Sequence, residues 1–305
     1  MPALRIVFMG TPEFAVPSLE ILIHHGYKVV AVVTAPDKPR GRGQVVTPSP
    51  VKAVALQHRI PVLQPTNLKS PGFLKELESY NANLQVVVAF RMLPESVWKM
   101  PALGTFNLHA SLLPQYRGAA PINWAIINGE KETGVTTFFL QQEIDTGDII
   151  FQEKEPIAET DDAGTLYERL RHKGARLVLK TVQAIEAGSC PSQPQVINGP
   201  MKTAPKIFRE TCRINWNQPA INIHNFVRGL CPYPAAWSVL NNKTYKVFKT
   251  EVINKEKQGP AGDYVTDHQS FLHVNTADGI ISIQELQPEG KRRMTIREFF
   301  RGNKL

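Results

Sequence analysis

The first ninety residues alternate between short apolar runs and amphipathic segments, and this alternation limits the chain to a small set of folds. Arg5–Met9 is an apolar run that ends in Gly10-Thr11-Pro12, and Phe14–His25 then has helical spacing. Val29–Thr34 is the next apolar run. Short runs that are apolar on both faces and separated by helices are typical of parallel strands buried within a sheet. The N-terminal part is therefore predicted to be an α/β domain with a doubly wound, Rossmann-like sheet.

The same alternation continues to about residue 187. Further strands are predicted at Val62–Leu63, Leu84–Phe90, Thr105–His109, Val135–Leu140 and Ile149–Ile157. Further helices are predicted at Pro50–His58, Gly72–Tyr80, Ala119–Asn128 and Thr165–Ala187. The pattern places the N-terminal domain at residues 1–189.

The composition and periodicity of the sequence change after residue 189. Residues 190–206 are rich in Pro and polar side chains and lack periodicity, which is typical of a linker. A helix is then predicted at Ala220–Gly229, followed by short strands at Trp237–Leu240, Tyr245–Thr250, Gly262–Val265, Leu272–Thr276 and Ile280–Leu286. Several short strands at close spacing favour a small barrel or sandwich, here at residues 207–305.

Basic charge is concentrated in the last third of the chain. The protein has a net charge of +8. Residues 1–190 hold 19 Lys and Arg against 18 Asp and Glu, whereas residues 191–305 hold 16 against 9. Such an excess indicates either a polyanionic partner or a solvated basic surface, and charge alone favours neither.

Other features exclude several classes of protein. No stretch approaches the roughly 20 apolar residues of a membrane span, and the N-terminus reads as a strand rather than a signal peptide. Cys190, Cys212 and Cys231 form no CxxC pair, so they suggest neither a zinc site nor a disulfide framework, and we expect a cytoplasmic protein. GxGxxG and Walker patterns are absent. Gly10-Thr11-Pro12 fits a tight turn as well as an anion site.

A basic loop is predicted after the second strand. Residues 36–44, PDKPRGRGQ, contain Lys38, Arg40 and Arg42 together with two glycines. The loop follows the C-terminal end of a strand, the edge at which doubly wound sheets bind ligands. Its cations could hold the phosphates of a large substrate, although an ordinary solvated loop has a similar composition. Its place in the predicted sheet favours binding.

Asn107 and His109 lie two residues apart on a predicted strand, so both side chains should point to one face. An amide donor beside an imidazole can polarise a carbonyl group and stabilise an oxyanion. Asp145, in the turn before Gly147, could hold the imidazole in the required protonation state. These three residue types occur together in many chains, and by themselves they leave the reaction class open.

The order of motifs resembles the formyltransferases that use 10-formyltetrahydrofolate. The resemblance rests on RIVFMGTPEFAVPSLE, VVTAPDKPRGRG, NLHASLLPQYRGAAPINWAI and GVTTFFLQQEIDTGDII, and it covers essentially the whole chain. It implies catalysis without a metal by a fixed trio, a bound reduced folate, and a basic, OB-like, tRNA-binding domain at the C-terminus. The residues that it assigns are Asn107, His109 and Asp145 for catalysis, and Ser111, Leu112, Leu113, Pro114, Phe90 and Met92 for folate.

Members of this family differ in the amine that accepts the formyl group. The basic loop and the basic last third favour the members that formylate the α-amino group of methionyl initiator tRNA, giving N-formylmethionyl-tRNA for translation initiation. The resemblance implies tRNA contacts for Arg42 above all, and Lys38, Arg40 and Lys206 are expected to join it. The alternatives are a small amine acceptor, such as glycinamide ribonucleotide or an amino sugar, and a non-catalytic tRNA-binding protein. A nucleotide-dependent oxidoreductase is the weakest alternative. We expect a monomer.

One segment departs from the family pattern. The family carries Ala-Tyr-Gly after the third buried strand, whereas this chain has Ala89-Phe90-Arg91 and is one residue shorter. Arg91 stands near the usual glycine, and an arginine with positive φ would be strained. The loop is therefore expected to follow another path.

Overall fold

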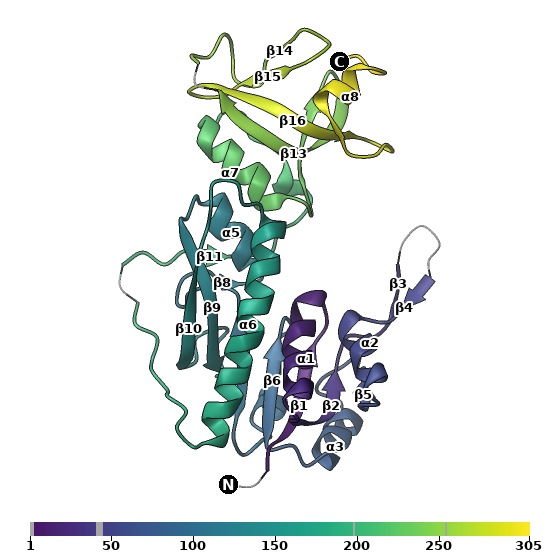
Figure 1. Cartoon of the computed structure of the whole chain (residues 1–305), viewed down its shortest axis with the longest axis vertical. Helices are drawn as coiled ribbons and strands as arrows, with labels where there is room; N and C mark the ends of the chain where they lie inside the picture. Colours follow the sequence, from purple (N-terminus) through teal and green to yellow (C-terminus); the bar gives the residue numbers. More distant parts are fainter. Residues whose placement is uncertain (1–2, 41–44, 198, 254) are drawn as a thin grey trace. The chain divides into compact units, whose positions relative to one another are not determined.

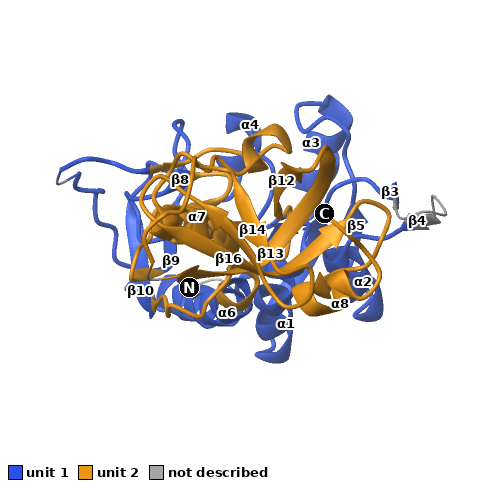
Figure 2. Ribbon diagram, turned by 90° about the horizontal axis from the view of Figure 1, so that it is seen from above, with its two compact units in different colours: residues 1–117, 134–155, 167–202 blue, residues 118–133, 156–166, 203–305 orange. Residues whose placement is uncertain are grey.

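The structure is a computed structural model, and it describes residues 3–40, 45–197, 199–253 and 255–305. The chain divides into two compact units (Figure 2). The first contains residues 1–117, 134–155 and 167–202, and the second contains residues 118–133, 156–166 and 203–305. The units interleave along the sequence, and the domain boundaries at 189 and 207 stay a prediction.

A seven-stranded sheet forms the centre of the first unit, in the order β10-β9-β7-β6-β1-β2-β5 (Figure 1). β1 pairs in parallel with β2 and β6, and β6 pairs in parallel with β7. β9 runs antiparallel to β7. The predicted Rossmann-like sheet is confirmed, with an antiparallel addition beside β7. Its strands are β1 (Arg5–Gly10), β2 (Lys28–Val33), β5 (Val62–Leu63), β6 (Leu84–Val88), β7 (Thr105–His109), β9 (Glu132–Phe139) and β10 (Ile149–Pro156).

Several helices of this part begin at prolines, and α2 also has a serine cap. Ser49 accepts a hydrogen bond from the Lys52 amide at 3.1 Å, and Pro50 occupies the first turn of α2. At Gly10 an added Cβ would lie 2.8 Å from the Cβ of Ala15, so close packing explains this glycine. The helices of the first unit are η1 (Glu13–Ala15), α1 (Val16–His24), α2 (Pro50–Gln57), α3 (Pro71–Ser79), α4 (Glu95–Trp98) and most of α6 (Ala163–Glu186). The helix α5 (Pro121–Ile127) belongs to the second unit.

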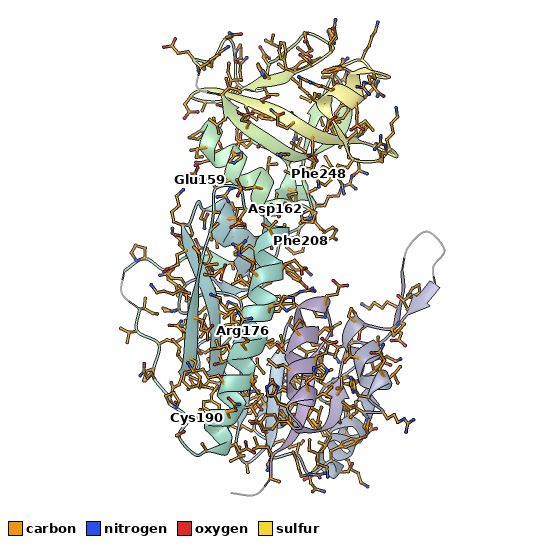
Figure 3. The ribbon with its side chains drawn as sticks, in the orientation of Figure 1. Glu159, Asp162, Arg176, Cys190, Phe208 and Phe248 are labelled. Atoms are coloured by element: carbon orange, nitrogen blue, oxygen red, sulfur yellow. The ribbon has the colours of Figure 1, made fainter. Side chains whose placement is uncertain are left out.

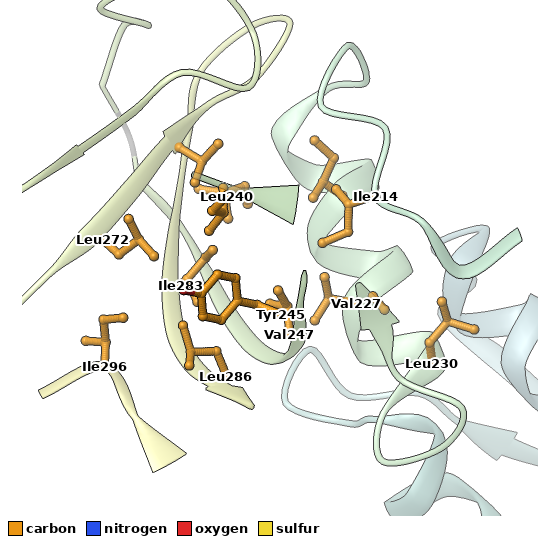
Figure 4. Packing of buried hydrophobic residues seen from close by; sticks show 14 of the residues in the cluster. Ile214, Val227, Leu230, Leu240, Tyr245, Val247, Leu272, Ile283, Leu286 and Ile296 are labelled. Atoms are coloured by element: carbon orange, nitrogen blue, oxygen red, sulfur yellow. The ribbon is translucent and has the colours of Figure 1, made fainter. Parts of the chain in front are cut away.

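The second unit is built around an antiparallel half-barrel in the order β12-β13-β16-β15-β14, with β17 paired to β16. Along β13, Tyr245 and Val247 are buried whereas Lys246 is exposed, the alternation of a sheet with one solvated face. Figure 4 shows the buried side packed with aliphatic residues from the strands and α7. The elements are α7 (Ala220–Leu230), β12 (Ala236–Leu240), β13 (Lys243–Ile253), β14 (Tyr264–Thr266), β15 (Leu272–Asn275), β16 (Ile280–Pro288), β17 (Met294–Thr295) and α8 (Ile296–Phe300).

Part of the predicted basic loop after β2 forms a strand. β3 (Lys38–Arg40) pairs antiparallel with β4 (Val45–Thr47). The β-branched run of residues 45–47 favours a strand, and its pairing with Lys38–Arg40 makes the predicted loop too broad at those three residues. Lys38 and Arg40 lie on β3, and Arg42 lies outside the described residues.

No helix in the described ranges is both long enough and apolar enough to span a membrane.

Candidate active site

Asn107 and His109 lie on β7, which lies between β9 and β6 in the sheet. Leu108 between them points to the other face, because its Cδ2 would lie 2.6 Å from a Cβ added at Gly174 of α6. Strand alternation therefore directs Asn107 and His109 to one face, away from α6; the sequence predicted the shared face. Asn107 is half-buried, and no described residue hydrogen-bonds its side-chain amide, so its two N–H donors are available.

The His109 ring is held in one orientation by the backbone. Its Nε2 lies 2.8 Å from the carbonyl oxygen of Tyr116. A carbonyl oxygen only accepts, so Nε2 carries a hydrogen and Nδ1 of the neutral ring has a free lone pair. Nδ1 lies 3.9 Å from Oδ2 of Asp145, with the two side chains 7% and 13% exposed. Nδ1 is therefore the atom that can take up a proton and, once protonated, face a carboxylate.

Asp145 belongs to the turn of residues 140–148, which connects β9 to β10. Its φ is 55°, in the left-handed region that Asp tolerates better than most residues. The Phe139 amide donates to the Asp148 carbonyl at 3.0 Å and closes the turn. Gly147 packs so closely that an added Cβ would lie 1.7 Å from the Phe139 carbonyl oxygen. The path of this turn, and with it the position of Asp145, depends on a glycine at 147.

The segment expected to bind folate is fixed by buried polar groups. The hydroxyl of Ser111 is fully buried and donates to the Gln115 carbonyl at 2.6 Å. Thr136 of β9 donates to the Ser111 carbonyl at 2.6 Å and accepts from the Leu113 amide at 3.2 Å. Gln152 of β10 donates to the Leu113 carbonyl at 2.9 Å. Leu112 and Pro114 are half-buried, so these two side chains remain partly accessible.

Thr136→Val should destabilise the protein, because a methyl group would face the Ser111 carbonyl, the Leu113 amide and the Gln152 side chain. Leaving buried polar groups without partners costs about 1–3 kcal/mol of unfolding free energy. Chemical denaturation of the variant should show this loss. Thr160→Val, at an exposed threonine, is the matched control and should leave the unfolding free energy unchanged. Equal stability of the two variants would contradict the network.

Arg91 is free of the backbone strain that a positive φ would impose in the loop after β6. The positive φ falls on Ala89, at 48°, and Arg91 is not among the residues with positive φ. Arg91 instead donates to the carbonyls of Thr66, at 3.0 Å, and Pro65. Phe90 is half-buried against the core of the first unit, and Met92 is 75% exposed.

Met92 and Arg91 line an open hollow of about 590 Å³ together with residues 66–69 and 94–96. Neither Asn107, His109 nor Asp145 lines it. Phe90 and Met92 were both expected to contact folate; Met92 borders this hollow and Phe90 does not.

The remaining residues expected to contact tRNA lie on separate elements. Lys38 is exposed on β3. Lys206 is exposed in the second unit, with its Nζ 5.3 Å from the ring centroid of Phe208.

Several residues that contact the trio or its neighbours escaped sequence reasoning. Tyr116 acts through its backbone carbonyl, and the Thr136 and Gln152 side chains hydrogen-bond the backbone carbonyls of residues 111 and 113. Gln195 lies in the aperiodic segment and donates to the carbonyls of Asp145 and Gly147. Only the YRG motif that contains Tyr116 carried a sequence signal. Within the described residues, no cluster of three or more His, Cys, Asp or Glu side chains is arranged to hold a metal ion.

Comparison with known proteins defines the class first. The family model "Formyl transferase" matches residues 4–182, and the model "Formyl transferase, C-terminal domain" matches residues 206–304. The chain therefore belongs to the formyl transferase family.

Two curated relatives are similar over nearly their whole length. The chain is 54% identical to the methionyl-tRNA formyltransferase of Bacteroides fragilis, covering 98% of this chain and 95% of that protein. It is 56% identical to the methionyl-tRNA formyltransferase of Azobacteroides pseudotrichonymphae, covering 98% and 96%. The N-formyltransferase of Helicobacter canadensis, solved with folinic acid and dTDP-3-aminofucose, shares the fold with a TM-score of 0.68 at 22% identity, covering 95% of this chain and 100% of that chain.

Proposed function

We propose that this chain transfers a formyl group from 10-formyltetrahydrofolate to the α-amino group of methionyl initiator tRNA, giving N-formylmethionyl-tRNA. The identity of more than half of all positions to two methionyl-tRNA formyltransferases, over nearly the full length, carries the proposal. The arrangement of Asn107, His109 and Asp145 supports this chemistry. The reaction belongs to translation initiation in the cytoplasm, and a monomer is the expected active form.

The trio can stabilise the negative oxygen and accept the amine proton that formyl transfer produces. The amine attacks the formyl carbon, the carbonyl oxygen becomes negative, and the carbon–nitrogen bond to the folate then breaks. Asn107 donates its free amide hydrogens to that oxygen. His109 accepts the proton of the attacking amine at Nδ1, where Asp145 faces the resulting imidazolium, and returns it to the leaving nitrogen. The pKa of an α-amino group is about 8, so the amine needs little help to become neutral.

The tRNA partner is supported by cations that stack on aromatic rings in the second unit. Lys206 lies over Phe208, and Arg213 lies 5.6 Å from the ring centroid of Trp237. Arg293 lies 4.7 Å from the ring centroid of Phe248. Phe208 and Phe248 are labelled in Figure 3. We call these three pairs the stacked cations.

The stacked cations are connected through the backbone and the sheet. The Trp237 indole donates to the Arg209 carbonyl at 2.8 Å, which joins β12 to the segment that carries Phe208. Trp237 pairs with the exposed Lys246 across β12 and β13, and Phe248 lies two residues further along β13, where the register with β16 shifts. Glu285 forms an ion pair with Arg293 at 2.6 Å and reduces the charge at that end. Cations held by rings are pre-positioned for phosphates, and RNA is the polyanion that this face suits.

Arg213→Ala should weaken tRNA binding, because it removes one cation of this face. The slope of log affinity against log salt should fall by about one, and kcat at saturating tRNA should stay near the wild-type value. Binding and initial rates measured over a range of salt concentrations test this. Lys255→Ala, which removes the same charge from an exposed site beyond the other end of β13, should leave the slope unchanged. Equal slopes for wild type and Arg213→Ala would contradict the assignment.

An acceptor comparison tests the proposed function itself. The purified protein and 10-formyltetrahydrofolate are combined with methionyl initiator tRNA, glycinamide ribonucleotide or a dTDP-amino sugar. Formylation of the tRNA, with little reaction of the small amines, is the expected result. Faster formylation of either small amine would show that the acceptor is a small amine, while the chain would still be a formyltransferase. Binding of tRNA without formylation would favour the non-catalytic alternative.

A further inference from the structure

The segment of residues 190–202, predicted as part of a linker, is tied to the first unit by hydrogen bonds. Gln193 forms a backbone bridge with Ile149, with bonds of 2.8 and 3.0 Å in the two directions. Lys202 accepts from the Tyr116 amide at 2.7 Å. Of the described residues between 192 and 200, Gln195 is the one that is not exposed. We call residues 190–202 the strap. The Gln195 side chain turns inward from it, whereas the neighbouring side chains are exposed.

The Gln195 amide joins the two parts of the chain that hold the His109–Asp145 pair. Its Nε2 donates to the carbonyls of Asp145 and Gly147, each at 2.8 Å. Its Oε1 accepts from Arg117 Nη2 at 2.6 Å and from Arg117 Nε at 3.2 Å. Arg117 directly follows Tyr116, whose carbonyl fixes the His109 ring. The Gln195 side chain thus uses both of its N–H donors and its oxygen to connect the Asp145 turn with Arg117, the residue after Tyr116.

We propose that Gln195 is a positioning residue, which sets the separation of His109 and Asp145 by holding the Asp145 turn against the Tyr116–Arg117 backbone. Within the proposed function, on which this inference rests, the strap completes a catalytic site whose reacting groups all come from β7 and the turn after β9. Asp145 has a left-handed φ and a carboxylate 3.9 Å from Nδ1, so a small shift of the turn changes the distance over which it acts.

Backbone hydrogen bonds hold the strap, so the role of the Gln195 side chain can be tested apart from the folding of the strap. The Gln193–Ile149 bridge and the Tyr116–Lys202 bond are made by the backbone, and neither uses the Gln195 side chain. A variant that lacks the side chain should keep the strap in place and release only the Asp145 turn. The effect should therefore appear in turnover before it appears in folding.

Gln195→Ala should lower kcat for formylation on the order of 10- to 100-fold, the scale of a misplaced catalytic group, with the KM values for tRNA and folate nearly unchanged. Gln195→Glu, of the same size, should be impaired as well, because a carboxylate cannot donate to the two carbonyls. Gln193→Ala is the matched control on the same strap and should retain the wild-type kcat. A wild-type kcat for both Gln195 variants would overturn the proposal.

A double variant shows whether Gln195 acts through Asp145. In an Asp145→Asn background, Gln195→Ala should lower kcat little further, because the carboxylate that it positions is already gone. Losses that multiply would show that Gln195 acts elsewhere, and would overturn the proposal.

Hydrogen exchange gives a readout that does not depend on the acceptor. In Gln195→Ala the amides of residues 143–148 should exchange faster than in wild type and in Gln193→Ala. If wild type formylates no tRNA and this difference is present, the proposed function fails while the Gln195 clamp stands. If exchange in the turn is unchanged, the clamp fails whatever the substrate is.

Discussion

His109→Ala should lower kcat for formylation of methionyl initiator tRNA by about 100- to 1000-fold, the loss typical of one essential donor or proton-transfer group. His109 is 6% exposed, its Nε2 is fixed by the Tyr116 carbonyl, and its Nδ1 faces Asp145. No other described histidine is paired with a carboxylate in this way. Initial rates at saturating folate and tRNA measure the effect.

Two controls separate catalysis from folding in this experiment. Thermal unfolding should show that His109→Ala still folds, since a small cavity does not unfold a domain of this size. His58→Ala, at an exposed histidine that follows α2, should have the wild-type kcat. A folded His109→Ala protein with the wild-type rate would remove His109 from the mechanism.

The second large effect is expected from a single methyl group. Gly147→Ala would place a Cβ 1.7 Å from the Phe139 carbonyl oxygen, a contact that backbone atoms can relieve only by moving the turn. Because Asp145 lies two residues away in the same turn, kcat should fall by about 100-fold, the scale of a 1 Å misplacement. Rates and thermal unfolding of the purified variant measure the loss.

Gly72→Ala is the matched control for this substitution. Gly72 lies in the first turn of α3, where an added Cβ meets nothing within 4 Å. This variant should keep the wild-type rate and stability. Full activity in Gly147→Ala would show that the turn has another conformation in solution and that Asp145 is positioned differently.

Much of the fold could be predicted because buried strands and amphipathic helices leave separate hydrophobic patterns. The runs at Leu84–Phe90 and Thr105–His109 predicted β6 and β7, and the helical spacing of Thr165–Ala187 predicted α6. The antiparallel direction of β9 could not be predicted, since periodicity does not encode strand direction. α8 was missed although Thr295 and Glu298 form a capping box, a signal that is readable in the sequence.

The candidate site divides in the same way. The side chains of Asn107, His109 and Asp145 were found through a motif, and their roles stay predictions. The Tyr116 carbonyl and the Gln195 amide were not found, because a backbone acceptor leaves no mark on residue type and a glutamine in an aperiodic segment reads as solvated. The sequence could place unusual strain after β6, but only the backbone shows that Ala89 carries it rather than Arg91.

The central claim is that this trio moves a formyl group onto the amine of a tRNA-bound methionine. The most direct test is a single-turnover reaction with 10-formyltetrahydrofolate labelled in its formyl carbon, comparing wild type with the Asn107→Ala/His109→Ala double variant. After hydrolysis of the ester, the label should appear as N-formylmethionine with wild type, and hardly at all with the double variant. Release of the label as free formate by wild type, or an equal yield of N-formylmethionine from the double variant, would contradict the account.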